Sequence, residues 1–171
     1  MNKLILVRPS KVIQNEILDY KQEHLALGVP INGSCGLEFY NDFDEWLKLV
    51  TSIEKEQLRN GVHTSTFFSV REQDKQIIGC CKIHHSLTSA LENGGHIAYG
   101  IRPTERNKEY GKMQLQNLLE VARNLKMHEV MIVCNKDNIA SARTAMSCGG
   151  ILIKEFEEDG ILHQRYIINL F

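Results

Sequence analysis

The stretch GHIAYGIRPTERNKEYGK, from Gly95 to Lys112, decides the fold of this chain. Its first part has the composition of a β-strand, which Pro103 ends. A cationic turn follows, and an amphipathic helix begins near Glu109. The first N–H groups of a helix have no partner within it and lie at the positive end of its dipole. The order of strand, cationic turn and helix therefore predicts a site for an anionic, phosphate-bearing ligand.

Three basic residues strengthen this prediction: Arg106, Lys108 and Lys112. Arginine and lysine are the side chains that bind phosphate oxygens with charge-assisted hydrogen bonds. The alternative is that they are ordinary solvated charges at a helix start, and the strand–turn–helix context favours the phosphate role. A nucleotide-hydrolysing loop is not predicted. The required glycine spacing is absent, and Met113 follows Lys112 where that motif needs Ser or Thr.

Hydrophobic periodicity and turn residues outside this stretch predict one mixed domain. We expect strands at 3–8, 64–71, 76–85, 95–102, 129–134, 151–157 and 161–169. We expect helices that begin near residues 10, 42, 109 and 138, the second ending near Asn60. The order β, α, α, β, β, β, α, β, α, β, β predicts a single α+β or mixed α/β domain over residues 1–171, with helices on both faces of one central sheet.

Composition excludes several classes of protein. The 171 residues are 43% hydrophobic and 24% charged, and the formal net charge is -1. That balance gives no general attraction to nucleic acid. The longest apolar run near the start, Leu4 to Val7, is too short for a signal peptide or a membrane span. We therefore expect a cytoplasmic protein with no membrane association.

The chain has an odd number of cysteines, five, and their spacing matches no disulfide framework. We therefore expect reduced thiols. The run from Cys80 to His85, CCKIHH, has ligand types typical of a metal site. On a strand, however, Cys80 and His84 share one face about 13 Å apart, at about 3.3 Å per residue. A single metal ion needs its ligands at about 2.0–2.3 Å. No metal site is therefore expected.

Two segments resemble the signatures of the GNAT superfamily of N-acetyltransferases, and the element order resembles that fold over nearly the whole chain. The first signature, Arg/Gln-x-x-Gly-x-Gly/Ala, corresponds to residues 106–111, where Arg106 and Gly111 match. The second is an Asn at a helix start, a Tyr seven residues later and then Gly. Asn138 and Gly149 match it. The resemblance implies a mostly antiparallel central sheet.

The resemblance also implies acetyl-CoA as acyl donor. The turn would bind its pyrophosphate through backbone N–H groups, and the strand at 95–102 would splay from the strand at 129–134 to pair with the pantetheine arm. An amine of a small molecule or peptide would then attack the thioester directly, with a backbone N–H stabilising the oxyanion. The residues assigned to the cofactor are Gly100, Ile101, Arg106, Asn107, Lys108, Tyr110, Gly111, Lys112, Asn138 and Ser141.

Two departures from the family pattern carry consequences. Glu109 stands where the first glycine belongs, so it must adopt an ordinary conformation or carry strain, and it adds a negative charge beside the phosphates. Ala145 stands where the family has the tyrosine that protonates the leaving thiolate. Ser141 or water could supply that proton. These departures motivate an alternative function, a catalytically silent acyl-CoA-binding regulatory module.

His96 is the candidate catalytic base, because it lies on the strand that would line the thioester and imidazole accepts protons near neutral pH. The alternative is an ordinary half-buried histidine.

No residue pattern in the sequence identifies the acceptor amine. Four acidic residues could form a pocket for a cationic amine or could simply be a solvated helix start: Glu38, Asp42, Asp44 and Glu45. A homodimer is the family-level expectation for assembly.

Overall fold

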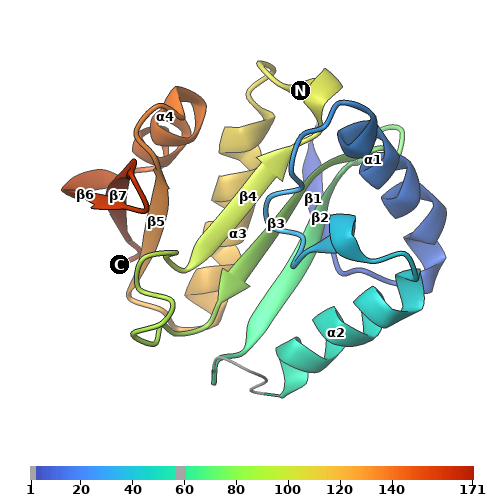
Figure 1. Ribbon diagram of the computed structural model, residues 1–171, viewed down its shortest axis with the longest axis horizontal. Coiled ribbons are helices and arrows are strands. Elements are labelled where there is room, and N and C mark those ends of the chain that lie inside the picture. Colours follow the sequence, from blue (N-terminus) through green and yellow to red (C-terminus); the bar gives the residue numbers. More distant parts are fainter. Residues whose placement is uncertain (1–2, 57–60) are drawn as a thin grey trace.

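The computed structural model describes residues 3–56 and 61–171, and these form one seven-stranded sheet flanked by helices (Figure 1). The strands are β1 (Leu4–Val7), β2 (Thr64–Arg71), β3 (Ile77–His84), β4 (Ile97–Ile101), β5 (Glu129–Asn135), β6 (Ile151–Glu158) and β7 (Ile161–Asn169). The helices are α1 (Gln14–Ala26), α2 (Phe43–Lys55), α3 (Tyr110–Asn124) and α4 (Ile139–Ser147), with short 3-10 turns η1 (Lys11–Ile13), η2 (Leu37–Phe39) and η3 (Pro103–Glu105).

The element order confirms the mixed fold that the sequence predicts, and two helix boundaries differ. The first helix opens with the 3-10 turn η1, so its α-helical part begins only at Gln14. The second ends at Lys55, earlier than the predicted end near Asn60. Residues 57–60 lie outside the described part of the chain. All five cysteines are free.

The strands run in the order β1-β2-β3-β4-β5-β7-β6, and every neighbouring pair is antiparallel except β4 and β5. These two central strands are parallel and share a single register pair, Ile97 with Ile132. After that pair they part, so no β5 residue pairs with Ala98 or with the residues that follow it in β4. The sheet thus contains the splay that the resemblance implies.

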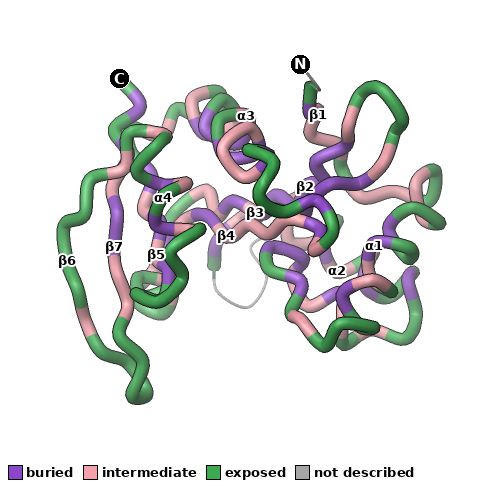
Figure 2. Tube along the Cα trace, turned by 90° about the horizontal axis from the view of Figure 1, so that it is seen from above, coloured by how far each residue is buried: buried purple, intermediate pink, exposed green. Residues whose placement is uncertain are grey.

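Each face of the sheet carries its own core. Leucines of α3 and alanines of α4 pack on one face with Cys81 and Ile83 of β3; we call it the α3 side. The aromatic residues of α1 and α2 pack with Cys80 on the other, the α1–α2 side. Figure 2 shows α3 and the pair α1 and α2 on opposite sides of the strands. Side chains alternate along a strand, so Lys82 and His84 share the α1–α2 side with Cys80.

A loop between α1 and α2 lies directly on strands β3 and β4. Gly33 takes a positive φ of 85°. A Cβ there would lie 2.7 Å from the Cα of Cys81 and 2.8 Å from the carbonyl oxygen of Ala98, so only glycine fits. The fully buried Trp46 of α2 holds the loop, because its Nε1 donates to the carbonyl of Ser34 at 2.8 Å. The helix and the loop are therefore one packed unit.

A buried arginine ties α1 to the end of β4. Arg102 is 4% exposed, and its Nε donates to the carbonyl of Ile77 at 2.7 Å. Its Nη1 donates to Glu23 at 2.9 Å and to Asp19 at 3.0 Å. The other oxygen of Glu23 accepts the backbone N–H and the hydroxyl of Thr104, at 3.0 and 2.9 Å. Glu23 therefore fixes the start of the turn that follows β4.

We predict that Glu23→Gln destabilises the protein in a pH-dependent way. Burial alone would raise the pKa of Glu23, but hydrogen bonds from Thr104 and the charge of Arg102 outweigh it and lower the pKa. A carboxyl whose folded pKa is lowered stabilises above its unfolded pKa, near 4.5, and loses that contribution as the pH falls through the folded pKa. Urea unfolding should show a loss of about 1–3 kcal/mol at pH 7 that shrinks below pH 4.5.

The matched control is Glu120→Gln, which removes an exposed ion pair with Arg123 on α3. Such pairs contribute little, so the control should change the unfolding free energy by under about 0.5 kcal/mol. An equal effect of the two substitutions, or a Glu23→Gln effect that is constant with pH, would contradict the assigned role of Glu23.

Candidate functional site

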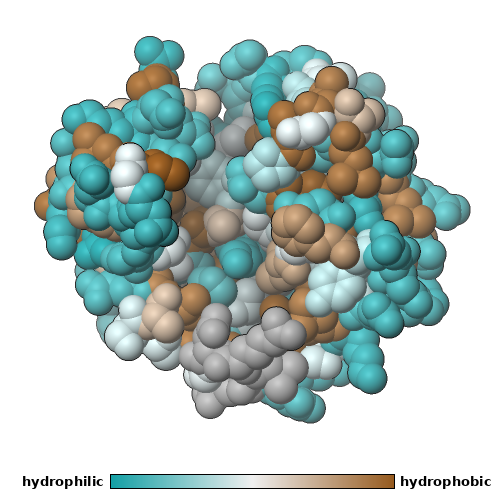
Figure 3. All heavy atoms as spheres, viewed as in Figure 1, coloured by the Kyte–Doolittle hydropathy of each residue, from teal (hydrophilic) through white to brown (hydrophobic). Residues whose placement is uncertain are grey.

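The surface is hollowed between the half that carries α1 and α2 and the half that carries α4 and the β6–β7 hairpin (Figure 3). In the same view β4 runs between these halves (Figure 1). Because β4 parts from β5 after Ile97, the backbone from Ala98 to Ile101 has an edge without a strand partner. Such an edge can pair with the amide groups of an extended ligand.

The turn after β4 has an unusual backbone. Asn107 and Glu109 both lie in the left-handed region, with φ values of 61° and 63°. Left-handed residues next to ordinary ones turn successive N–H groups toward one side, which makes an anion-binding concavity. Helix α3 begins directly afterwards, at Tyr110, and its first N–H groups add to this concavity. Of the two alternatives for Glu109, the structure adopts the strained one.

The basic side chains of the turn differ in their partners. Arg106 is exposed, and its Nε donates to the carbonyl of Ile101 at 3.2 Å. Lys108 pairs with Glu105 at 3.0 Å. Lys112 is half-buried on the first turn of α3, and among the described residues no carboxylate pairs with it or with Arg106. Two cations of the turn are thus available to an anion.

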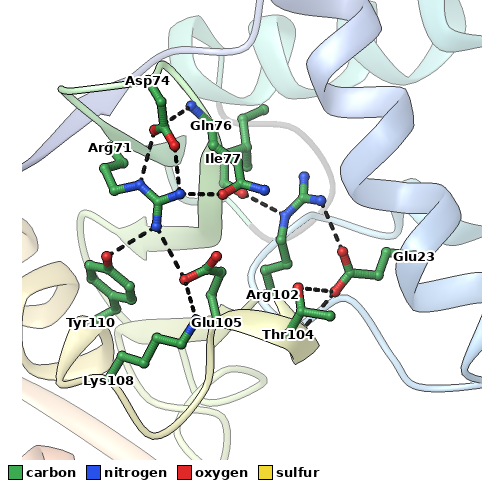
Figure 4. A network of polar contacts seen from close by, with 10 residues as sticks. All are labelled: Glu23, Arg71, Asp74, Gln76, Ile77, Arg102, Thr104, Glu105, Lys108 and Tyr110. Atoms are coloured by element: carbon green, nitrogen blue, oxygen red, sulfur yellow. Dashed lines mark hydrogen bonds and ion pairs between the residues drawn. The ribbon is translucent and has the colours of Figure 1, made fainter.

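A polar network beneath the turn holds it in place (Figure 4). Arg71, at the end of β2, donates to Glu105 at 3.2 Å and to the hydroxyl of Tyr110 at 3.1 Å. Its other nitrogens bind Asp74, which lowers the pKa of that carboxyl to about 2. The side chain of Tyr110 is therefore buried, and only its backbone remains near the predicted phosphate site. Sequence reasoning missed Arg71, because it belongs to no motif.

The remaining predicted cofactor residues lie around the splay. A Cβ on Gly100 would come within 3.3 Å of Asn32, and one on Gly111 within 3.3 Å of Thr144 in α4, so both positions are closely packed. Asn138 caps α4 by accepting the N–H of Ser141 at 3.1 Å. The structure thus gathers residues of β4, the turn, α3 and α4 around one opening.

Tyr99 joins β4 to α4 across this opening. Its hydroxyl lies 3.0 Å from the hydroxyl of Ser141 and donates to the carbonyl of that residue at 3.1 Å. Burial raises the pKa of Tyr99, and the hydrogen bond to Ser141 opposes that shift. Ser141 therefore presents a hydrogen-bonded hydroxyl at the start of α4.

His96 lies just before β4, next to β5. Its Nδ1 accepts the backbone N–H of Met131 at 2.9 Å, and its own backbone N–H donates to the carbonyl of Met131 at 2.8 Å. Burial lowers its pKa, so the ring is neutral near pH 7 and carries its proton on Nε2. The lone pair that a base needs is already engaged. His96 could accept a proton at Nδ1 only by releasing Met131.

Three of the four acidic residues considered for an acceptor pocket, Glu38, Asp42 and Asp44, have other partners; Glu45 lies exposed on the first turn of α2. Glu38 accepts the N–H of Ile31 at 3.2 Å and the hydroxyl of Ser34 at 3.1 Å. Asp42 caps α2 because its side chain accepts the backbone N–H of Asp44. The carboxylate of Asp44 forms an ion pair with Lys11. These carboxylates hold the loop and the helix start. Among the described residues, no group of three or more His, Cys, Asp and Glu side chains could hold a metal ion.

A family profile described as the acetyltransferase (GNAT) domain matches residues 32–151. The chain therefore belongs to the GNAT acetyltransferase family. No curated protein matches it at a significant level of sequence similarity. None of the helices in the described part of the chain is long and apolar enough to cross a membrane.

Solved structures share the fold over almost the whole chain. RimL, an alpha-N-protein acetyltransferase of a ribosomal protein in complex with coenzyme A, is 16% identical with a TM-score of 0.72, covering 99% of this chain and 96% of RimL. The microcin self-immunity acetyltransferase MccE, in complex with acetyl-CoA and AMP, is 15% identical with a TM-score of 0.71, over 99% and 93%. The putative acetyltransferase yncA from Salmonella typhimurium, with acetyl-CoA, is 15% identical with a TM-score of 0.68, over 99% and 95%.

We predict that Glu109→Gly stabilises the protein. A left-handed conformation costs a residue with a Cβ about 1–2 kcal/mol, which glycine avoids, although glycine loses more backbone freedom on folding. The net gain in unfolding free energy should be about 0.5–1 kcal/mol by urea denaturation. Affinity for coenzyme A should rise or stay unchanged, since a negative charge leaves the turn.

The control for this prediction is Gln116→Gly, at an exposed position inside α3. It should lose about 1 kcal/mol, the usual cost of glycine in a helix. If Glu109→Gly loses stability as the control does, the strain assigned to Glu109 is absent. If it folds normally but binds coenzyme A far more weakly, the carboxylate has a positive role in binding.

Proposed function

We propose that this protein transfers an acetyl group from acetyl-CoA to the amine of a small molecule or peptide. The observation that carries the proposal is the opening of the sheet after Ile97, flanked by the left-handed turn before α3. The free edge of β4 suits the amide groups of pantetheine, and the turn suits a pyrophosphate. One site thus offers complementary backbone for both chemical parts of the donor.

In this proposal the cofactor residues divide by role. The N–H groups of Asn107 to Lys112 bind the pyrophosphate, and Arg106 and Lys112 add positive charge. The backbone of Gly100 and Ile101 pairs with the pantetheine arm. Asn138 and Ser141 lie at the start of α4, beside the thiol end. Lys108 contributes less charge than the sequence suggests, because Glu105 already neutralises it.

The chemistry needs one bond formed and one broken. The acceptor nitrogen attacks the thioester carbonyl carbon, a C–N bond forms, and the C–S bond breaks. The nitrogen loses a proton and the leaving thiolate gains one. A β4 backbone N–H stabilises the oxyanion, and the thiolate takes its proton either from water or through the Ser141 hydroxyl, which lies against Tyr99 and then regains a proton from water.

We propose that the proton of the attacking amine leaves through water rather than directly to His96. The engaged Nδ1 supports this, because proton acceptance there would break the hydrogen bond between His96, just before β4, and Met131 of β5. RimL and MccE are solved with coenzyme A and acetyl-CoA respectively, which supports the donor. Their identity to this chain is too low to carry over an acceptor. The cytoplasmic location and the homodimer stay predictions.

We predict that the protein binds coenzyme A and that Arg106→Gln weakens this binding about tenfold. A hydrogen bond to a charged group contributes about 1.5–3 kcal/mol. At a free concentration about 100 times Kd, coenzyme A should add about 2.7 kcal/mol to the unfolding free energy. Calorimetry measures Kd, with Lys48→Gln on the exposed face of α2 as the control that leaves Kd unchanged.

No heat and no thermal shift with millimolar coenzyme A would refute the donor. Binding of acetyl-CoA without turnover on a broad amine panel would instead favour the silent acyl-CoA-binding module.

We predict that His96→Gln lowers kcat less than tenfold and leaves the rise of rate with pH intact. The glutamine carbonyl can still accept the N–H of Met131, so the strands keep their contact. His96→Leu removes that acceptor and should cost about 1–3 kcal/mol of stability. A direct base would instead give a decrease in kcat of about 10²–10⁴ and a changed pH profile. That result would restore His96 as the proton acceptor.

A further inference from the structure

Lys82 occupies a position next to the opening of the sheet. It pairs with Ala98 in the β3–β4 ladder, and Ala98 is the first β4 residue beyond the last pair with β5. Neighbouring strands lie about 4.8 Å apart. The base of the Lys82 side chain is therefore one strand spacing from the point where β4 and β5 part. Its side chain lies on the α1–α2 side, since Cys81 and Ile83 enter the opposite core.

No carboxylate of the described residues forms an ion pair with this lysine. Within residues 3–56 and 61–171, no Asp or Glu oxygen lies within 4.0 Å of its ammonium group, and no hydrogen bond engages that group. The loop that covers β3 and β4 contains Glu38, whose two oxygens are used within the loop. Glu92, on the connection before β4, pairs with Arg165. The carboxylates of these neighbouring segments are committed elsewhere.

The groups that face Lys82 within β2 and β3 are neutral. Thr66 faces it across β2 and β3, and the next residue on the same side, His84, contacts the hydroxyl of Thr64 at 2.7 Å. Burial and the charge of Lys82 lower the pKa of His84 to about 4, so this ring is uncharged at neutral pH. On β5, Met131 and Val133 lie on the same side as Lys82, because Val130 and Ile132 enter the α3-side core. Farther from Lys82, Arg165 of β7 pairs with Val133 in the ladder and forms an ion pair with Glu92. Lys82 is thus a positive charge with neutral neighbours within β2 and β3 and no ion-pair partner among the described residues.

We infer that the acceptor is an amine with a carboxylate or phosphate group close to its nitrogen, and that Lys82 binds this anion. The inference rests on the proposed function, because it places the acceptor on the α1–α2 side of the splay. A lysine ammonium is a point charge that binds either oxyanion. The same charge repels a second ammonium group, so it selects against diamines and polyamines. Lys82 is therefore a specificity residue.

The test compares amines that differ only in the anion. The matched pairs are O-phosphoethanolamine with ethanolamine and alanine with alaninamide, and putrescine represents the diamines. Release of coenzyme A thiol gives kcat/KM for the wild type, Lys82→Met and the control Lys48→Met. Methionine keeps the length of the side chain and removes the charge. An unchanged Kd for coenzyme A verifies that each variant is folded.

We expect the wild type to prefer the anionic member of at least one pair by tenfold or more. Lys82→Met should reduce that preference at least tenfold, and Lys48→Met should not. The pair that responds distinguishes a phosphate from a carboxylate. Turnover that favours putrescine, or equal turnover of both members of each pair, would overturn the inference and leave the acetyltransferase proposal intact. If Lys82→Met does not fold, the wild-type preference alone decides.

A binding measurement separates this inference from the proposed function. Calorimetry of O-phosphoethanolamine and alanine on the protein loaded with coenzyme A should give a Kd that Lys82→Met weakens at least tenfold. Such binding, combined with no turnover on the broad amine panel, would favour the silent acyl-CoA-binding module and still support Lys82 as an anion site. If Lys82→Met changes neither the turnover nor the binding of the anionic amines, the inference about Lys82 is overturned, whereas the acetyltransferase proposal is decided by coenzyme A binding and the broad amine panel.

Discussion

The organisation of this molecule depends on how few residues pair between β4 and β5. Antiparallel neighbours in this sheet pair over many residues, but these two parallel strands pair only at Ile97 and Ile132. Beyond that pair the backbone groups of β4 are left for another partner, and the sheet opens instead of closing. An open strand edge inside a sheet is unfavourable unless something pairs with it or covers it. The structure keeps this edge at the bottom of a hollow, which is where an extended donor molecule fits.

Keeping the edge open requires rigid supports on both sides. On the α1–α2 side, the buried Arg102 connects Glu23 of α1 to the carbonyl of Ile77 in β3. Below the turn, Arg71 connects Glu105 to Tyr110. Both networks are charge-assisted and largely buried, so removing one partner leaves the other costly to solvate. The left-handed turn between them is consequently held in a conformation that Glu109 would not adopt alone.

The same geometry divides the possible chemistry between the two faces. The α3 side supplies the start of α4 and the Tyr99–Ser141 hydrogen bond, beside the proposed leaving thiolate. The α1–α2 side supplies Lys82 and the loop that lies on β3 and β4. Donor and acceptor can therefore approach the opening from opposite faces. That arrangement allows direct transfer, because neither ligand has to leave before the other arrives.

The sequence by itself determined the element order, the mixed fold and the turn before α3, because periodicity, capping and turn chemistry are local properties of the chain. Through its resemblance to the family motifs it also singled out Arg106, Asn138 and Gly111 as candidate cofactor residues, which stay predictions. Only the tertiary structure decided the partners: that Lys108 pairs with Glu105, that the ring of His96 accepts the N–H of Met131, and that Lys82, beside the opening, has no ion-pair partner in the part of the chain that the structure describes. The His96–Met131 contact and the position of Lys82 beside the opening join segments distant in sequence, and the Lys108–Glu105 pair, although its residues are only three apart in the chain, depends on how the turn folds. No local pattern encodes that information.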